Sequence, residues 1–244
     1  MLGGEIMEKN RSSKVVAIVA LFIAVIGLSV GFAAFSNTLT IKSSATVKPS
    51  DKDFVVGFVE NTTDTALPTG DVELKADAIT VVGENASYLK SETLKPTLNG
   101  TTVSNLHANF TKPGESVSYK FAVANFGKYD AYLTNVTFAN VADQSAYKVC
   151  TVTPVTGEGQ TAATEALVTE ACKGIDVSVK IDTATYNGAD GSKANINTVL
   201  SRNTNNVKEV VVTISYAEGS EVADGAFSVD FGDITLGYSS VAQQ

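Results

Sequence analysis

The chain has 244 residues, with 18 basic and 26 acidic side chains and a formal net charge of −8 at pH 7. It contains one histidine and two cysteines. Binding to nucleic acid is therefore not expected, since the sequence has no basic patch that could neutralise the phosphates of DNA or RNA. A single histidine also excludes zinc sites that need paired histidines.

An apolar run, VVAIVALFIAVIGLSVGFAAF, occupies residues 15–35 and follows three basic residues. This pattern is typical of a secretory signal peptide, which we assign to residues 1–33. We expect a signal peptidase to cut between Ala33 and Ala34, because Gly31 and Ala33 are small. The run is also long enough to span a membrane, so an uncleaved anchor is the alternative.

Met7 is the preferred start of the protein. The preceding residues, MLGGEI, include Leu-Gly-Gly-Glu, which the codons of a bacterial ribosome-binding sequence can encode. The source is then a bacterium. The chain is expected to be secreted, extracellular or at the cell surface, and to meet the membrane only through its N-terminal segment before cleavage.

Residues 34–244 amount to 211 residues, with 15 basic and 24 acidic side chains and a net charge near −9. This length is enough for one large domain with its own hydrophobic core. We expect an extended segment at 34–48 and a β-sandwich domain at 49–244.

Several segments alternate apolar and polar residues with the period of two that a half-buried strand requires. The strictest alternation covers 72–77, 117–123 and 175–181. Further strands are expected at 54–59, 132–138, 149–155, 210–216 and 227–238. In the last of these the apolar phase changes across Gly232 and Asp233, which predicts a β-bulge at Gly232.

Turn signals separate these strands: 112–114, 125–127, 187–188 and 224–225. About nine strands at this spacing predict an all-β fold, an antiparallel β-sandwich or jelly roll. Only residues 161–173, TAATEALVTEACK, have the character of a helix.

Cys150 and Cys172 form an even pair in a chain that leaves the reducing compartment. A disulfide between them is the natural interpretation. Two free buried thiols are the alternative.

No pattern for catalysis stands out. The sequence lacks a GxSxG elbow, a P-loop and EF-hand spacing. His107 is alone, and we interpret it as structural. We therefore predict no enzyme activity, no catalytic residues, no cofactor and no metal site. A calcium site would have to use acidic residues at strand ends, namely Asp182, Asp190, Asp224, Asp230 and Asp233.

Two stretches of the sequence are informative together: GFAAFSNTLTIKSSATV at 31–47 and KPGESVSYKFAVANFGKYDAYLTNVTF at 112–138. They resemble the TasA/camelysin family, secreted proteins of Gram-positive bacteria that assemble into biofilm-matrix fibres. The resemblance implies a jelly-roll subunit that donates an N-terminal strand to a neighbouring subunit. The camelysin name also implies a metallopeptidase. A chain with a single histidine cannot supply the usual zinc ligands of such an enzyme.

The residues after the expected cleavage site fit such a strand. One face of the segment is apolar and the other is polar, which suits a strand that completes a sheet. Pairing within its own domain is equally compatible with this pattern. The apolar face, and hence the candidate donor strand, consists of Phe35, Leu39, Ile41, Ala45 and Val47.

The sequence therefore favours a secreted structural subunit of an extracellular filament or biofilm matrix, with itself as partner. The alternative is a membrane-anchored adhesin or binding domain at the cell surface.

Overall fold

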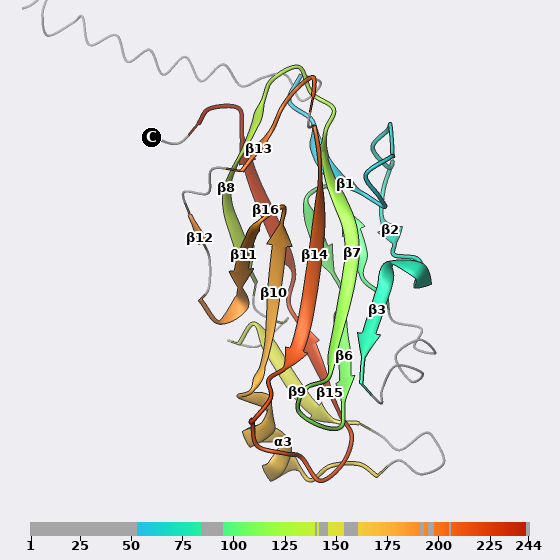
Figure 1. Cartoon of the computed structure of the whole chain (residues 1–244), viewed down its shortest axis with the longest axis vertical. Helices are drawn as coiled ribbons and strands as arrows, with labels where there is room; N and C mark the ends of the chain where they lie inside the picture. The colour runs from blue at the N-terminus through green and yellow to red at the C-terminus, as the bar shows by residue number, and fades with distance from the viewer. Residues whose placement is uncertain are drawn as a thin grey trace, which may run out of the picture. The chain divides into compact units, whose positions relative to one another are not determined.

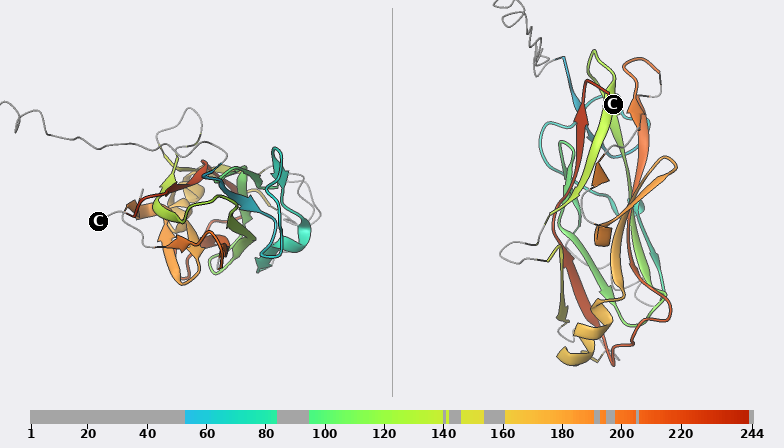
Figure 2. Two further views of the ribbon diagram at one scale, coloured as in Figure 1. Left: turned by 90° about the horizontal axis from the view of Figure 1, so that it is seen from above. Right: turned by 90° about the vertical axis from the view of Figure 1, so that its left-hand side faces the viewer.

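The structure of the chain is a computed structural model that describes residues 53–83, 95–139, 141, 146–153, 161–190, 193–194, 198–204 and 206–242. All of them lie in one compact unit, Pro49–Gln244. Its strands pair antiparallel and form two facing layers, which Figure 2 shows from their edges. The prediction of an all-β, sandwich-like fold is confirmed.

The first layer is a six-stranded sheet that runs β1-β7-β14-β10-β11, with β3 also paired to β7 (Figure 1). Its strands are β1 (Val56–Val59), β3 (Ile79–Val82), β7 (Ser116–Asn125), β10 (Ile175–Ile181), β11 (Ala184–Asn187) and β14 (Val207–Tyr216). β3 pairs with the first half of β7 and β1 with the second half. These two short strands therefore lie end to end along one edge of β7.

The second layer consists of two sheets that continue one another. The seven-stranded sheet contains β2 (Val72–Glu73), β4 (Thr97–Asn99), β5 (Thr102–Ser104), β8 (Ala131–Phe138), β12 (Lys193–Ala194), β13 (Val199–Leu200) and β16 (Ile234–Ser239). The three-stranded sheet contains β6 (Leu106–Phe110), β9 (Lys148–Val152) and β15 (Phe227–Phe231). β5 leads directly into β6, and β15 into β16, so each passes from one sheet to the other.

The β-bulge predicted at Gly232 is wrong in detail. Phe231 lies opposite Leu106 and Ile234 opposite Val103, so two residues separate the pairs on each strand. A bulge would need an extra residue on one strand. Both strands instead bend together, and Asn105 adopts a positive φ of 57° at the bend. The register shift lies further on, between Gly237 and Tyr238.

The core lies between the layers and follows the predicted alternation of β7, β10 and β14. Phe121 is 1% exposed and packs edge-on against Phe58, with ring centroids 4.8 Å apart. Phe110, Tyr216 and Phe227 form a second group, with centroids 5.7–6.3 Å apart. Burial of each large apolar side chain stabilises the fold by roughly 2 kcal/mol.

The strand expected at 72–77 is only partly present. β2 ends at Glu73, and the 3-10 helix η1 (Ala76–Ala78) follows. Leu74 is nevertheless 1% exposed, and its backbone N–H donates to the Pro96 carbonyl. The apolar and polar residues at 72–77 alternate because single side chains such as Leu74 are buried, although the strand pairing does not continue beyond Glu73.

The helix expected at 161–173 forms as α3 (Glu165–Cys172), which buries Val168 and Ala171. The Asp224 carboxylate accepts a hydrogen bond from the Thr164 backbone N–H at 2.8 Å, where the helix begins. Helix N-termini favour such an acceptor. The Cys150–Cys172 disulfide joins α3 to β9, with Cα atoms 6.0 Å apart. The predicted disulfide is thus present.

Replacing both Cys150 and Cys172 with serine is expected to lower the free energy of unfolding by about 3 kcal/mol, because the unfolded chain is no longer constrained by the loop. Urea unfolding followed by circular dichroism measures this loss. Adding a reductant should destabilise the native protein equally and leave the double variant unchanged. A reductant that does not affect the native protein would contradict the structural role of the bond.

Candidate functional site

The predicted cleavage site and donor strand, residues 33–47, lie outside the described residues. Asp53 is the first described residue, and it lies at the 125–130 turn between β7 and β8. The Lys128 backbone N–H donates to the Asp53 carbonyl at 2.7 Å, and the Lys128 ammonium lies 2.6 Å from the Asp53 carboxylate. The chain before Asp53 therefore joins the sandwich at this end.

Gly127 allows that junction. A Cβ at this position would lie 2.7 Å from the Asp53 carbonyl oxygen and 2.8 Å from the Val55 nitrogen. Both contacts are with backbone, which cannot move aside cheaply. Glycine is thus required because two chain segments approach closely.

Asn125 holds the same turn from inside. It is 1% exposed, and its side-chain amide donates to the carbonyls of Tyr129 at 2.8 Å and Leu200 at 3.0 Å. Its side-chain oxygen accepts from the Gly127 backbone N–H at 2.9 Å. The Asn-x-Gly turn at 125–127 therefore has a structural role, because the Asn125 side chain clamps the turn to β13.

Replacing Asn125 with alanine should lower the free energy of unfolding by about 2–4 kcal/mol, because buried backbone groups lose their partners. Denaturant unfolding measures the change. Asn187→Ala is the matched control at an exposed position on β11 and should change stability by less than about 0.5 kcal/mol. Equal effects of the two substitutions would rule out the clamp.

Glu115 has the corresponding role at the other end of β7. Its side chain is 2% exposed, and its carboxylate accepts hydrogen bonds from the Thr111 backbone N–H at 2.6 Å and the Thr111 hydroxyl at 2.7 Å. The Lys112 backbone N–H also donates to it, at 3.2 Å. Gly114 completes the turn with a φ of 88°. The Lys-Pro-Gly motif is therefore also structural.

The edges of the sheets are the parts that another chain could extend. β7 and β14 have ten residues each, whereas the edge strands β1, β3 and β11 have four. Short edges limit uncontrolled pairing with other chains. β11 is the last strand of the six-stranded sheet, so its outer side pairs with no other strand among the described residues.

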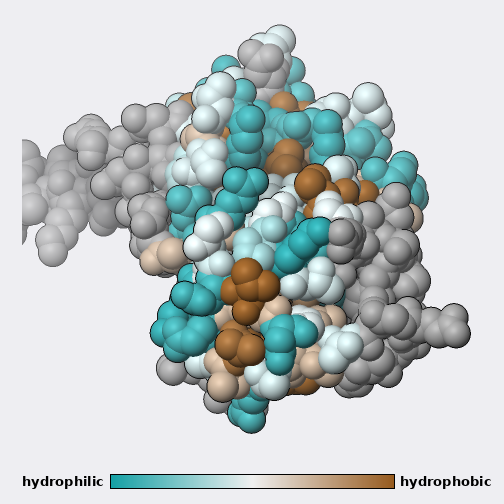
Figure 3. Space-filling view, turned by 60° about the horizontal axis from the view of Figure 1, so that its bottom comes forward, coloured by the Kyte–Doolittle hydropathy of each residue, from teal (hydrophilic) through white to brown (hydrophobic). Residues whose placement is uncertain are grey.

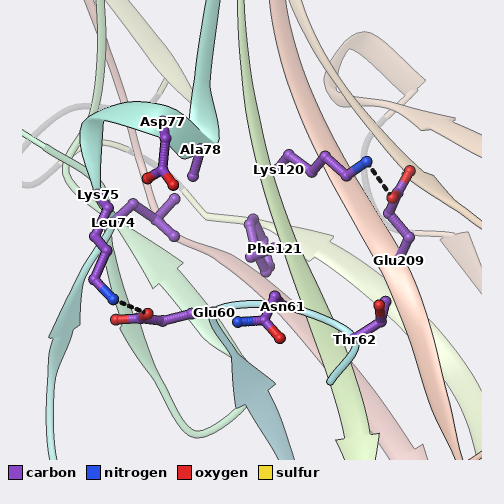
Figure 4. A pocket seen from close by; sticks show the side chains of 10 residues that line it. All are labelled: Glu60, Asn61, Thr62, Leu74, Lys75, Asp77, Ala78, Lys120, Phe121 and Glu209. Carbon is purple, nitrogen blue, oxygen red and sulfur yellow. Dashed lines mark hydrogen bonds and ion pairs between the residues drawn. The ribbon is translucent and has the colours of Figure 1, made fainter. Parts of the chain in front are cut away.

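A pocket of about 290 Å³ opens where β1 ends and β3 begins, beside the middle of β7 (Figure 4). Its lining contains Glu60, Asn61, Thr62, Leu74, Lys75, Asp77, Ala78, Lys120, Phe121 and Glu209. Lys75 pairs with Glu60 at 2.6 Å, and Lys120 with Glu209 at 2.5 Å. Two ion pairs thus flank a small apolar floor, an arrangement suited to holding a polar ligand or side chain.

His107 lies on the outer side of β6, with Nδ1 2.7 Å from the Asp230 carboxylate on β15. Its backbone carbonyl accepts a hydrogen bond from the Tyr119 hydroxyl at 2.5 Å. These contacts tie β6 to β15 and to β7 across the core. The interpretation of His107 as structural fits these contacts.

The acidic residues considered for calcium lie in different parts of the fold. Asp182 pairs with Lys208 at 2.6 Å, while Asp224 and Asp230 have the partners described above. Within the described ranges, no three His, Cys, Asp or Glu side chains gather as a set that could hold a metal ion.

Tyr147 and Lys148 connect β9 to β10 in the opposite layer. The Tyr147 hydroxyl donates to Asp176 at 2.6 Å, and the Lys148 ammonium donates to the Ile175 carbonyl. Burial lowers the pKa of Lys148, which the charge of Asp176 opposes. Burial and the hydrogen bond to Asp176 raise the pKa of Tyr147. These contacts fasten one side of the sandwich.

Tyr238 on β16 differs from Tyr147 because its buried hydroxyl has no hydrogen-bond partner among the described residues. Burial raises the pKa of this phenol, and Tyr186 adds to the shift. The folded state therefore keeps the proton at pH values where the unfolded chain loses it. Unfolding releases a proton above pH ~10, so stability falls as the pH rises beyond that value.

Tyr238→Phe is expected to raise the free energy of unfolding at pH 7 by about 1 kcal/mol, because a buried unpaired hydroxyl is removed. The variant should also lose less stability above pH ~10. Tyr147→Phe is the control and should lower stability by about 1 kcal/mol, because Asp176 loses a donor. Chemical denaturation at both pH values measures these changes. A large loss of stability in Tyr238→Phe would contradict this interpretation.

No protein-family model, curated protein or solved structure matches the chain. Within the described part of the chain, no helix has the length and apolar character needed to cross a membrane. The resemblance to the TasA/camelysin family therefore stays a sequence-based prediction.

Proposed function

We propose that the chain is a secreted structural subunit of an extracellular filament or biofilm matrix. Each subunit gives the strand at 34–47 to the sandwich of its neighbour. The proposal includes removal of the signal peptide between Ala33 and Ala34, a start at Met7 and a jelly-roll topology for the domain.

One observation carries the proposal: residues 34–47 alternate apolar and polar side chains and therefore have an apolar face of their own. Such a segment can extend a sheet in another subunit, where backbone hydrogen bonds give affinity and alternate side chains give register.

Two further features support the proposal. The disulfide suits a chain exported from the reducing cytoplasm. The outer side of β11 pairs with no described strand, so a strand that has its own register signal can extend the sheet there.

Replacing Leu39 and Ile41 with aspartate should abolish long polymers of the processed protein, because the charges would be buried without partners in the neighbouring core. Circular dichroism of the domain should stay unchanged. Thr38→Asp with Thr40→Asp, on the other face of the strand, is the matched control and should still polymerise. Size-exclusion chromatography and electron microscopy measure assembly.

Two results would contradict the proposal. Unfolding of the monomer by Leu39→Asp with Ile41→Asp would be the first, since the strand would then belong to its own domain. Filaments of this variant that match those of the control would also reject strand donation.

The second candidate is a membrane-anchored surface adhesin, and the pocket between Glu60 and Glu209 is the observation that favours it. The intact mass of the exported protein separates the two candidates. A mass that begins at Ala34 supports the filament subunit, and a mass that retains residues 15–33 supports the anchored form.

A further inference from the structure

A small apolar surface surrounded by acidic side chains lies at the α3 end of the sandwich. Leu167 on α3 is 38% exposed, and Val222 in the loop after β14 is 57% exposed. Figure 3 brings this end forward and shows brown groups among teal ones. We call this the α3-end surface; its exposed side chains are Glu165, Leu167, Glu170, Lys173, Glu218, Glu221, Val222 and Asp224.

The two segments that form this surface are fastened to each other. Asp224 accepts the hydrogen bond at the start of α3, and the Ala217 backbone N–H donates to the Gly174 carbonyl at 2.9 Å. The Tyr216 hydroxyl donates to the Glu221 carbonyl. The disulfide holds the other end of the helix. The exposed apolar groups are therefore presented on a pre-organised support, which reduces the entropy that binding must remove.

Charge restricts what can cover this surface. It contains five carboxylates, while Lys173 pairs with Glu170 at 2.5 Å and the exposed Lys112 lies on the neighbouring turn, whose Gly114 N–H donates to the Tyr216 carbonyl. Carboxylates therefore outnumber ammonium groups at this end. Two copies of the α3-end surface would repel each other, because like charges would meet as water is removed. The partner must therefore have a neutral or basic surface with apolar groups.

The opposite end of the same domain has these properties. Tyr129 is 43% exposed and Val241 is 70% exposed. Asp130 accepts a hydrogen bond from the Arg202 backbone N–H at 2.9 Å, which places the exposed Arg202 beside Tyr129. Lys128 pairs with Asp53, so these two charges compensate each other.

The position of Asp53 adds a geometric reason. The donor strand ends at Val47, and six residue steps reach at most about 20 Å. A neighbour that receives the strand must therefore lie close to the Asp53 end of the donor. In a filament that repeats by translation along the strands, the α3 end of one subunit lies next to the Asp53 end of its neighbour.

We propose that the α3-end surface docks on the Asp53 end of a second copy, as a head-to-tail contact additional to strand donation. This inference rests on the proposed function. Leu167 and Val222 meet the apolar groups at Tyr129 and Val241, and Arg202 faces the acidic side chains.

The test compares Val222→Asp with Val82→Asp in the full, processed chain. Val82 is a matched control because it is 56% exposed on the outer side of β3. Val222→Asp should raise the concentration needed for assembly at least tenfold, while Val82→Asp should behave like the native protein. Arg202→Glu should weaken assembly more than Lys180→Glu, which makes the same charge change on the exposed side of β10. Light scattering and electron microscopy measure assembly, and circular dichroism verifies that each variant is folded.

The outcomes separate this contact from strand donation. A native protein that never assembles rejects the proposed function and the contact with it. Normal assembly of Val222→Asp and Arg202→Glu, together with loss of assembly in Leu39→Asp with Ile41→Asp, rejects the α3-end contact alone. Equal weakening by Val222→Asp and Val82→Asp also rejects it, because the effect would then follow from charge alone.

Discussion

The pairing of β7 with β14 is the interaction on which the rest of the sandwich depends. Its register runs from Val207 opposite Ala124 to Ser215 opposite Ser116, the longest ladder in the described fold. Every second side chain of both strands points into the core, and β1, β3 and β10 are added at their edges. A register slip of one residue would turn the whole apolar set outward.

Two buried polar side chains fix the ends of β7. Glu115 accepts hydrogen bonds from the N–H groups of the turn before it, and Asn125 bonds the turn after it to β13. Removing either partner would leave buried groups unpaired, and such groups cost more than an ordinary hydrogen bond contributes. The same Asn125 turn receives the chain at Asp53. The point where the candidate donor strand joins the domain is thus one of its most firmly held turns.

The two ends of the domain therefore have different roles in the proposed filament. The Asn125 turn holds Asp53, the first described residue, and the α3 end presents apolar groups inside an acidic border. A domain with unlike ends favours head-to-tail over symmetric association, and a head-to-tail contact that does not close generates a fibre. Strand donation and end contact would then act along the same axis.

Long strands with strict alternation, such as 117–123 and 175–181, were predictable because burial of one face imposes a period of two. α3 was predictable from its composition, and the disulfide from an even pair of cysteines in a chain that is predicted to be exported. The short strands β11, β12 and β13 were not predicted, because two to four residues contain too little periodicity. Tertiary contacts with β8 and β10 define them.

The hairpin of β4 and β5 had a local signal that the strand patterns did not use. Gly100 and Thr101 form the two-residue loop between the paired Asn99 and Thr102, and glycine at the first loop position, here with a φ of 55°, is a favoured hairpin signal. The pocket had no such signal, because its lining comes from four separate segments that only the fold brings together. The α3-end surface was likewise invisible, since Leu167 and Val222 are distant in the sequence.

The most direct test of the account is the location of the 34–47 strand in assembled material. Lys42 provides an amine within this segment for chemical cross-linking. Filaments should be grown from a mixture of ¹⁵N-labelled and unlabelled processed subunits, and Lys42 cross-links to the domain analysed by mass spectrometry. The account predicts many cross-links that join a heavy chain to a light chain. If every Lys42 cross-link stays within one isotopic species, the strand belongs to its own domain and strand donation is contradicted.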